Sequence, residues 1–150
     1  SPAVKRVDVG LAIIYLALDG VKLVNDQFGH SAGDDLIVSA ANLVRHTLRS
    51  DDVVARIGGD EFAIAATGQD ERSLEVIVDR LRHQFDGQLF SQMWSTPMLA
   101  SIGAAIAAPG ESATTVIARA DTSMYSHKSR RRRRGTSRSN SIIRVGTVSR

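Results

Sequence analysis

The sequence contains no cysteine among its 150 residues. Disulfide bonds and thiolate metal sites are therefore excluded, and a reducing compartment is the simpler expectation. Aromatic residues make up only 5% of the chain and hydrophobic residues 43%, so any core must be mainly aliphatic. A chain of this length suffices for one domain with a buried core.

Hydrophobic runs long enough to cross a membrane are also missing. The longest run, Val9–Leu18, has ten residues and ends at Asp19, whereas a membrane-spanning helix needs about 20. Lys5, Arg6 and Asp8 interrupt the N-terminal stretch, so we expect no signal peptide. Together these features predict a cytoplasmic location and no membrane segment.

Acidic residues are absent from one end of the chain. Residues 1–127 contain all 16 acidic residues but only 10 of the 19 lysine and arginine residues, a net charge of −6. Residues 128–150 contain the other 9 basic residues, including the run Arg130–Arg134. We therefore predict an acidic domain over residues 1–128 and a basic flexible tail over residues 129–150. Such a tail attracts nucleic acid or anionic lipid without sequence preference, so no specific nucleic-acid partner is expected.

Hydrophobic periodicity predicts an α+β domain. Two apolar runs are typical of buried strands, three longer segments have apolar residues at helical spacing, and two short strands flank a Gly-Gly turn. In chain order the predicted elements are a strand at Val9–Leu18, a helix at Ser31–Leu48, hairpin strands at Val53–Ile57 and Phe62–Ala66, a helix at Asp70–Phe85, a strand at Met98–Ala108 and a helix at Ser112–Lys128. This order predicts a ferredoxin-like or polymerase-palm-like fold with a mixed, largely antiparallel sheet backed by helices.

The turn of the predicted hairpin carries the residues Gly58, Gly59, Asp60, Glu61 and Phe62. Glycines let the backbone approach a ligand where a side chain would block it. Carboxylates are the hard oxygen ligands that hold magnesium against nucleotide phosphates. Taken alone, the same pattern is equally typical of an ordinary hairpin connection with solvated acidic residues.

A second group of polar residues precedes the hairpin. Gly29 and Gly33 are expected to divide this stretch into a short helix, a turn and a long helix, with Asn25 and Asp34 on the two sides of the turn. An amide and a carboxylate aimed at one spot can read the edge of guanine, which offers two N–H donors beside an acceptor. The alternative is that both residues cap helices, which is common for asparagine and aspartate near helix starts. Spacing alone favours the caps.

Four motifs together resemble the GGDEF family of diguanylate cyclase domains. Over residues 9–128 the chain contains the strings N-D-x-F-G-H-x-x-G-D from Asn25, R-I-G-G-D-E-F from Arg56, S-I-G from Ser101 and A-D-x-x-M-Y-x-x-K from Ala120. On this resemblance, two GTP molecules bound to two antiparallel domains condense to cyclic di-GMP and pyrophosphate. The implied protein is a bacterial nucleotidyltransferase that acts as a homodimer and produces a second messenger for signal transduction.

The resemblance also implies roles for individual residues. Asp60 and Glu61 would be the catalytic carboxylates that bind Mg²⁺ or Mn²⁺, together with the backbone carbonyl of Leu18. Six residues would contact GTP: Asn25, Asp34, Gly58, Gly59, Lys128 and Arg132. Of these, the first two would bind guanine instead of capping helices, the glycines would lie against the phosphates, and the last two would contact the β- and γ-phosphates.

An inhibitory site for the product is implied by a second spacing. Arg49 and Asp52 form an Arg-x-x-Asp pair at the offset from the hairpin that marks the family's product-inhibition site, and Arg80 occupies the place of a further arginine. At this site the arginine would bind a guanine and a phosphate of cyclic di-GMP. The alternative is an ion pair between Arg49 and Asp52 at a helix end.

One residue departs from the family pattern at the metal site. The family's first strand ends Asp-x-Asp-x-Phe-Lys, and the matching string here runs from Ala17 to Lys22. The metal-binding aspartate is therefore replaced by Ala17, which has no side-chain oxygen. Asp19 shares the strand face but lies two residues along, about 6.6 Å away. Loss of even an indirect metal partner can lower metal affinity or activity about 10–100-fold.

Three functions therefore remain open. The first is a metal-dependent diguanylate cyclase, and the second is a catalytically weak domain that senses GTP or cyclic di-GMP. The third is a nucleic-acid binder that uses the arginine-rich tail, although the predicted strands lack the aromatic stacking residues that such surfaces need. The family's opening helix, with its Asp-x-Leu-Thr-Gly-Leu string, is missing, so we expect a fragment of a longer chain with sensory or effector domains.

Overall fold

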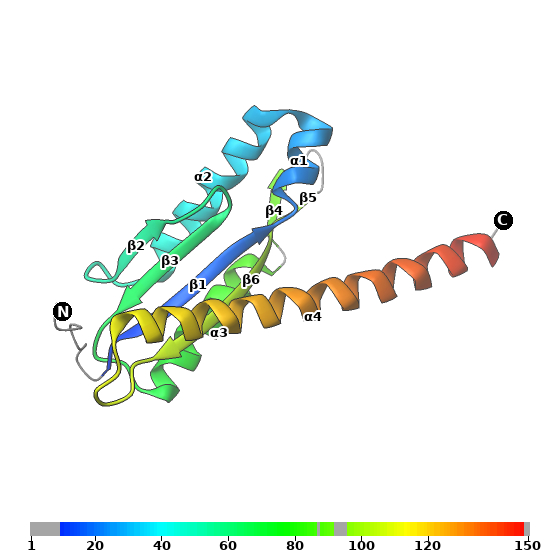
Figure 1. Ribbon diagram of the computed structural model, residues 1–150. Helices are drawn as coiled ribbons and strands as arrows, with labels where there is room; N and C mark the ends of the chain where they lie inside the picture. Colours follow the sequence, from blue (N-terminus) through cyan, green and yellow to red (C-terminus); the bar gives the residue numbers. More distant parts are fainter. Residues whose placement is uncertain (1–9, 87, 92–95, 149–150) are drawn as a thin grey trace.

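A four-stranded antiparallel sheet forms the centre of the molecule (Figure 1). The computed structural model describes residues 10–86, 88–91 and 96–148. The strands β1 (Ala12–Asp19), β2 (Val53–Arg56), β3 (Glu61–Ala66) and β6 (Leu99–Ile106) lie in the order β2-β3-β1-β6. The α+β prediction is confirmed, but every strand pair in this sheet is antiparallel and not mixed. The predicted start of the first strand at Val9 lies outside the described residues.

Helices cover both faces of this sheet because its strands alternate two sets of apolar side chains. On one face, Ile14 and Leu16 of β1 belong to a large core with α1 (Val21–Phe28), α2 (His30–Thr47) and α3 (Glu71–Phe85). On the other face, Ile13 and Tyr15 belong to a smaller core beneath α4 (Ala113–Val148). Figure 1 shows α4 crossing one face while α2 lies on the other. No helix in the described ranges is both long and apolar enough to span a membrane.

Two details of the chain path differ from the sequence expectation. Gly33 does not break the chain, because α2 begins at His30 and continues through it. A second, two-stranded sheet of β4 (Leu89–Ser91) and β5 (Thr96–Pro97) precedes β6 and was not predicted. Strands of three and two residues are too short to leave a periodic signal in the sequence.

Helix α4 is longer than the sequence predicted. A flexible tail was expected from residue 129, but the structure continues α4 through this segment to Val148. Arginine is a good helix former and no proline interrupts the segment, so helix propensity extends the helix in spite of the charge run. Figure 1 shows the C-terminal half of α4 extending away from the sheet, so only its first half positions residues over the strands.

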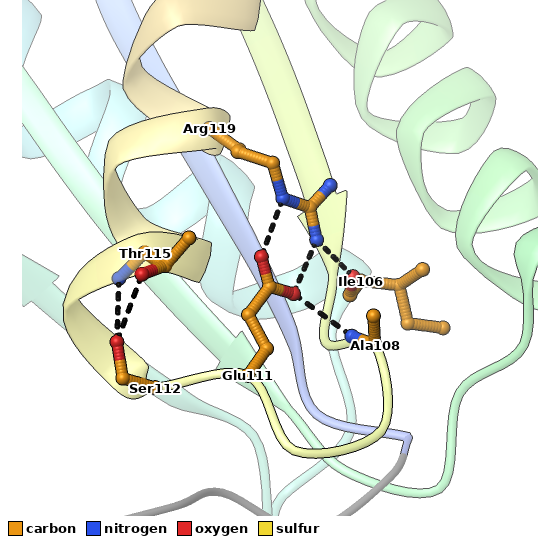
Figure 2. A network of polar contacts seen from close by, with 6 residues as sticks. All are labelled: Ile106, Ala108, Glu111, Ser112, Thr115 and Arg119. Carbon is orange, nitrogen blue, oxygen red and sulfur yellow. Dashed lines mark hydrogen bonds and ion pairs between the residues drawn. The ribbon is translucent and has the colours of Figure 1, made fainter. Parts of the chain in front are cut away.

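An ion pair fixes the turn between β6 and α4 (Figure 2). Arg119 donates from Nε to Glu111 Oε2 at 2.8 Å and from a second nitrogen to Oε1 at 2.7 Å. The same guanidinium also donates to the carbonyl of Ile106. Glu111 Oε1 in addition accepts from the N–H of Ala108 at 2.8 Å. The hydrogen bond from Arg119, and next that from Ala108, lower the pKa of Glu111 to about 2.

This lowered pKa predicts how stability depends on pH. A carboxyl group with a lowered folded-state pKa stabilises the fold above its ordinary pKa of 4.5, and the contribution is lost as the pH falls toward 2. We expect Glu111→Gln to be less stable than the wild type at pH 7 and to approach it near pH 2. Denaturant unfolding across this range measures the difference. Parallel pH curves for the two proteins would contradict the expectation. Ser112→Ala, which removes the hydroxyl that caps Thr115 N–H, is the control. Its stability should fall with pH below 4.5 in the same way as that of the wild type.

Candidate functional site

The glycine-rich loop lies beside the end of β1. β2 ends at Arg56 and β3 begins at Glu61, so a four-residue loop joins them, shifted by one residue from the loop that the predicted strands leave at residues 58–61. The N–H of Ile57 donates to the carbonyl of Glu61 at 2.9 Å and closes the loop. The N–H of Leu18 donates to the carbonyl of Asp60 at 2.8 Å, which ties the loop to the last residues of β1.

Neither Gly58 nor Gly59 is required by the fold. Both lie outside the set of glycines with positive φ. A Cβ added at Gly59 would meet nothing within 4 Å, and one at Gly58 would meet Glu61 at an ordinary 3.7 Å. A bare backbone with open space beside it suits the close approach of a ligand, which is the role expected from the sequence.

Arg56 holds this loop in place, a role that sequence reasoning missed. Its guanidinium donates to the carbonyls of Gly58 at 3.2 Å and Gly59 at 2.8 Å. These bonds direct the two carbonyl groups toward Arg56. They fix the position of the two glycines, which have no side chains to make such contacts. The signal in the sequence was an arginine two residues before a pair of glycines. This pattern is too common to predict that the arginine binds the carbonyl groups of the loop.

The acidic pair meets the end of β1 at one corner of the sheet. Ala17 is directly opposite Glu61 on β3, and the backbone of Leu18 is bonded to Asp60. The N–H and C=O of a residue in an antiparallel strand point to the same neighbour, so the Leu18 carbonyl also faces the loop. The structure therefore brings together the three groups that the sequence placed at a metal site.

The Asp19 carboxylate is bonded to the neighbouring strand β6. The hydroxyl of Ser101, a fully buried residue of β6, donates to Asp19 Oδ2 at 2.9 Å. β6 and β3 lie on opposite sides of β1. The hydrogen bond therefore directs one oxygen of the Asp19 carboxylate toward β6, and the fully buried Ala17 offers no side-chain oxygen opposite Glu61.

The remaining donor set fits a metal that is bound together with a nucleotide. Within the described part of the chain, no group of three or more histidine, aspartate or glutamate side chains could hold a metal ion. Mg²⁺ is commonly held by one or two carboxylates plus the phosphates of a substrate. Asp60, Glu61 and the Leu18 carbonyl supply hard oxygen ligands of this kind, so they fit a magnesium ion shared with phosphates.

Asn25 and Gly33 form the second part of the site. Asn25 lies in the last turn of α1, and its Oδ1 is buried with no hydrogen-bond partner among the described residues. α2 passes so close that a Cβ on Gly33 would lie 1.7 Å from this oxygen. The helix N-caps here are Gly20 and Gly29, so the capping alternative for Asn25 and Asp34 is wrong. α2 covers this oxygen, whereas Asp34 is exposed in the same helix.

This packing predicts that Gly33→Ala damages ligand binding more than stability. The methyl group must displace the Asn25 amide, which is the end of a flexible side chain, so the fold can adjust. We expect the melting temperature to fall by only a few degrees, while affinity for GTP falls about tenfold because a guanine contact is misplaced. Calorimetric titration with GTP and thermal unfolding measure the two effects. The role of Gly33 would be refuted if GTP affinity and melting temperature fell together, or if neither of them changed.

Helix α4 is aligned along β6 by three side chains spaced four residues apart. The three bonds join Arg119 to the carbonyl of Ile106, Ser123 Oγ to the N–H of Ala104 at 3.3 Å, and His127 Nδ1 to the N–H of Ile102 at 2.9 Å. Four helical residues advance about 6 Å and two strand residues about 6.6 Å. The two elements therefore stay in register, and each turn of α4 passes two residues of β6.

This register places Lys128 at the level of the acidic pair. Lys128 follows His127 and so lies level with Ser101, whose partner on β1 is Ala17, which in turn lies opposite Glu61. Lys128 shares a flank of α4 with Asp121, which lies two turns earlier. Burial, followed by the charges of Asp121 and Glu61, raises the pKa of Tyr15. The side chain of Arg132 lies outside the described residues, although its backbone belongs to α4.

A separate pocket brings together Arg49, Asp52 and Arg80. The pocket has a volume of about 350 Å³ and lies between α3 and the turn after α2. Asp52 Oδ2 accepts from the backbone N–H of Arg49 at 3.0 Å, beyond the end of α2 at Thr47. Among the described residues there is no ion pair between these two side chains. The ion-pair alternative is therefore not supported, and Arg49 is one of the residues that line the pocket.

Two further residues of this pocket were missed by sequence reasoning. Arg72 lies two turns before Arg80 on α3, about 12 Å along the helix, and the half-exposed Val76 lies between them. Gln69 also lines the pocket and carries a buried Oε1 without a partner among the described residues. The spacing of eight between the two arginines was the available signal.

Comparisons with known proteins agree with this geometry. The family model for the diguanylate cyclase GGDEF domain matches residues 2–134. The chain is 32% identical over 125 residues to MucR of Pseudomonas aeruginosa, a bifunctional diguanylate cyclase/cyclic di-GMP phosphodiesterase; the match covers 82% of this chain and 18% of MucR. It is similar to the GGDEF domain of TpbB from Pseudomonas aeruginosa, with a TM-score of 0.74, 30% identity, and coverage of 81% and 78%. It is also similar to the GGDEF domain of DgcB from Caulobacter crescentus in complex with c-di-GMP, with a TM-score of 0.73, 26% identity, and coverage of 80% and 72%.

Proposed function

Because the chain belongs to the GGDEF family of diguanylate cyclase domains, we propose that it condenses two GTP molecules to cyclic di-GMP and two pyrophosphates. The observation that carries the proposal is the bare Gly58–Gly59 backbone beside Asp60 and Glu61, at glycines that the fold does not need. The gap at Ala17 makes the cyclase weak, so slow turnover is part of the proposal.

The chemistry depends on positioning two nucleotides against each other. In each half-reaction a 3′-hydroxyl oxygen bonds to the α-phosphorus of the other GTP, the bond from that phosphorus to pyrophosphate breaks, and the hydroxyl proton is released. One chain positions one GTP, so catalysis requires a homodimer with the two sites face to face. Bound Mg²⁺ or Mn²⁺ supplies charge neutralisation of the phosphates and lowers the pKa of the attacking hydroxyl.

The residues of this chain bind the metal, the guanine base and the phosphates of GTP. Asp60, Glu61 and the Leu18 carbonyl hold the metal, and the glycine backbone allows the phosphates to approach the loop. Asn25 and Asp34 accept N–H donors of guanine, which fixes the orientation of the base. Lys128, with Arg132 one turn further along α4, pairs with the β- and γ-phosphates.

Product inhibition is the proposed role of the second pocket. Arg49 and Arg80 line it from two elements, and Asp52 holds the turn that carries Arg49. Cyclic di-GMP offers guanine edges and two phosphates to these guanidinium groups. The alternative function uses the same pockets without chemistry: a domain that senses GTP or cyclic di-GMP, favoured by the missing oxygen at Ala17.

The protein acts as part of a larger system in this proposal. The chain spans about 18% of the length of MucR, so sensory or effector domains of a longer chain would control it. GTP as substrate fits a cytoplasmic location, and no specific nucleic acid is needed as a partner.

Incubation of the purified chain with GTP and Mg²⁺ or Mn²⁺ tests the proposal, with products separated by mass-resolved chromatography. We expect cyclic di-GMP from the wild type and none from Gly59→Ala, whose melting temperature should match the wild type because the new methyl group has open space. The sensing alternative would be selected if the wild type binds GTP without forming product and the Ala17→Asp variant does form product. No binding of GTP or of cyclic di-GMP would refute both functions.

A further inference from the structure

The outer edge of β6 is covered by side chains of α4. β6 is an edge strand, so the N–H groups of Ile102 and Ala104 point away from β1. Such groups need a partner when they are buried. Ser123 Oγ and His127 Nδ1 accept them, one helical turn apart. These two side chains act as substitutes for a further strand.

His127 provides the bond nearest to the proposed phosphate-binding residue. The helix approaches the sheet closely at Gly103, where an added Cβ would lie 1.9 Å from the backbone nitrogen of Met124. The C-terminal half of α4 extends away from the sheet (Figure 1). Of the three bonds that align α4 with β6, the one from Ile102 N–H to His127 Nδ1 lies farthest along the helix.

We propose that His127 is a positioning residue for Lys128, because it fixes the adjacent turn of α4 at the level of Ala17 and Glu61. The inference rests on the proposed function, since it assumes that Lys128 pairs with GTP phosphates. Nδ1 accepts an N–H, so it carries no proton, and the imidazole acts here as an acceptor. Without this acceptor, the nearest described contacts that hold the helix to β6 are those of Ser123 and Met124, one turn earlier.

A matched pair of variants tests the role. His127→Leu keeps a side chain of similar bulk and removes the acceptor, whereas His127→Asn presents Oδ1 at the place of Nδ1. We expect His127→Leu to bind GTP about three- to tenfold more weakly, and His127→Asn to recover most of the loss. Guanosine has no phosphates, so its affinity should stay within about twofold in both variants. Amide exchange of Ile102 should be faster in His127→Leu only.

The outcomes separate this inference from the function on which it rests. Unchanged GTP affinity in His127→Leu, with fast exchange at Ile102, would overturn the positioning role while leaving the proposed function in place. Equal losses for GTP and guanosine would overturn it in favour of general destabilisation, which a lower melting temperature would accompany. Failure of the wild-type chain to bind GTP would refute the proposed function itself, and the positioning role with it. Ser123→Ala, which removes the acceptor one turn earlier, is the control for loss of an edge bond away from Lys128.

Discussion

Ala17→Asp should raise the rate of cyclic di-GMP formation at least about tenfold. The Cβ atoms of directly opposite residues in an antiparallel pair lie about 4.5–5.5 Å apart, so the introduced carboxylate would reach the metal site from opposite Glu61. Even indirect metal partners change activity about 10–100-fold, and a direct ligand should matter more. Initial rates measured by chromatography at saturating GTP and Mg²⁺ give the comparison.

The same substitution should make stability depend on the metal. Position 17 is fully buried, and the new carboxylate lies beside Glu61, so like-charge repulsion lowers stability in the absence of a divalent cation. Mg²⁺ with GTP should raise the melting temperature of this variant more than that of the wild type. Ala17→Val, which adds bulk but no side-chain oxygen, is the control and should gain no rate. An Ala17→Asp variant no faster than an active wild type would mean that the ligand set is complete without position 17.

Arg49→Ala should weaken cyclic di-GMP binding about 10–100-fold. Arg49 lines the pocket together with Arg80, and the Asp52 carboxylate accepts from the Arg49 backbone N–H. Charge-assisted hydrogen bonds to a guanine and a phosphate contribute about 1.5–3 kcal/mol, and each 1.4 kcal/mol is a factor of ten. Calorimetric titration with cyclic di-GMP measures the loss, and product inhibition should decline in parallel.

Controls for Arg49→Ala come from the same pocket and from the same helix. Arg72→Ala should also weaken binding, because Arg72 lines the pocket two turns from Arg80. Arg82→Ala removes a positive charge from α3 outside this pocket and should leave the affinity within about twofold. Equal losses in Arg49→Ala and Arg82→Ala would mean that only the overall charge of this surface attracts the ligand.

Many elements of the fold could be predicted because each leaves a local signal. β1 and β6 are long apolar runs, and α3 begins at an Asp70–Ser73 capping box that follows a strand. The β4–β5 pair and the length of α4 could not be predicted. The first is too short for periodicity to show, and the second depends on helix propensity in a charge run that is also typical of flexible tails.

The sequence by itself determined the composition of the candidate site, because the residue types at Asn25, Asp34, Gly58, Gly59, Asp60 and Glu61 follow one another in recognisable strings. It also determined that position 17 offers no side-chain oxygen, because alanine has none in any fold. Only the tertiary structure decided how these groups meet. The pairing of β1 with both β3 and β6 sets Ala17 opposite Glu61, and turns Asp19 toward Ser101. These placements arise from hydrogen bonds and packing between segments far apart in the chain, which local residue patterns do not encode.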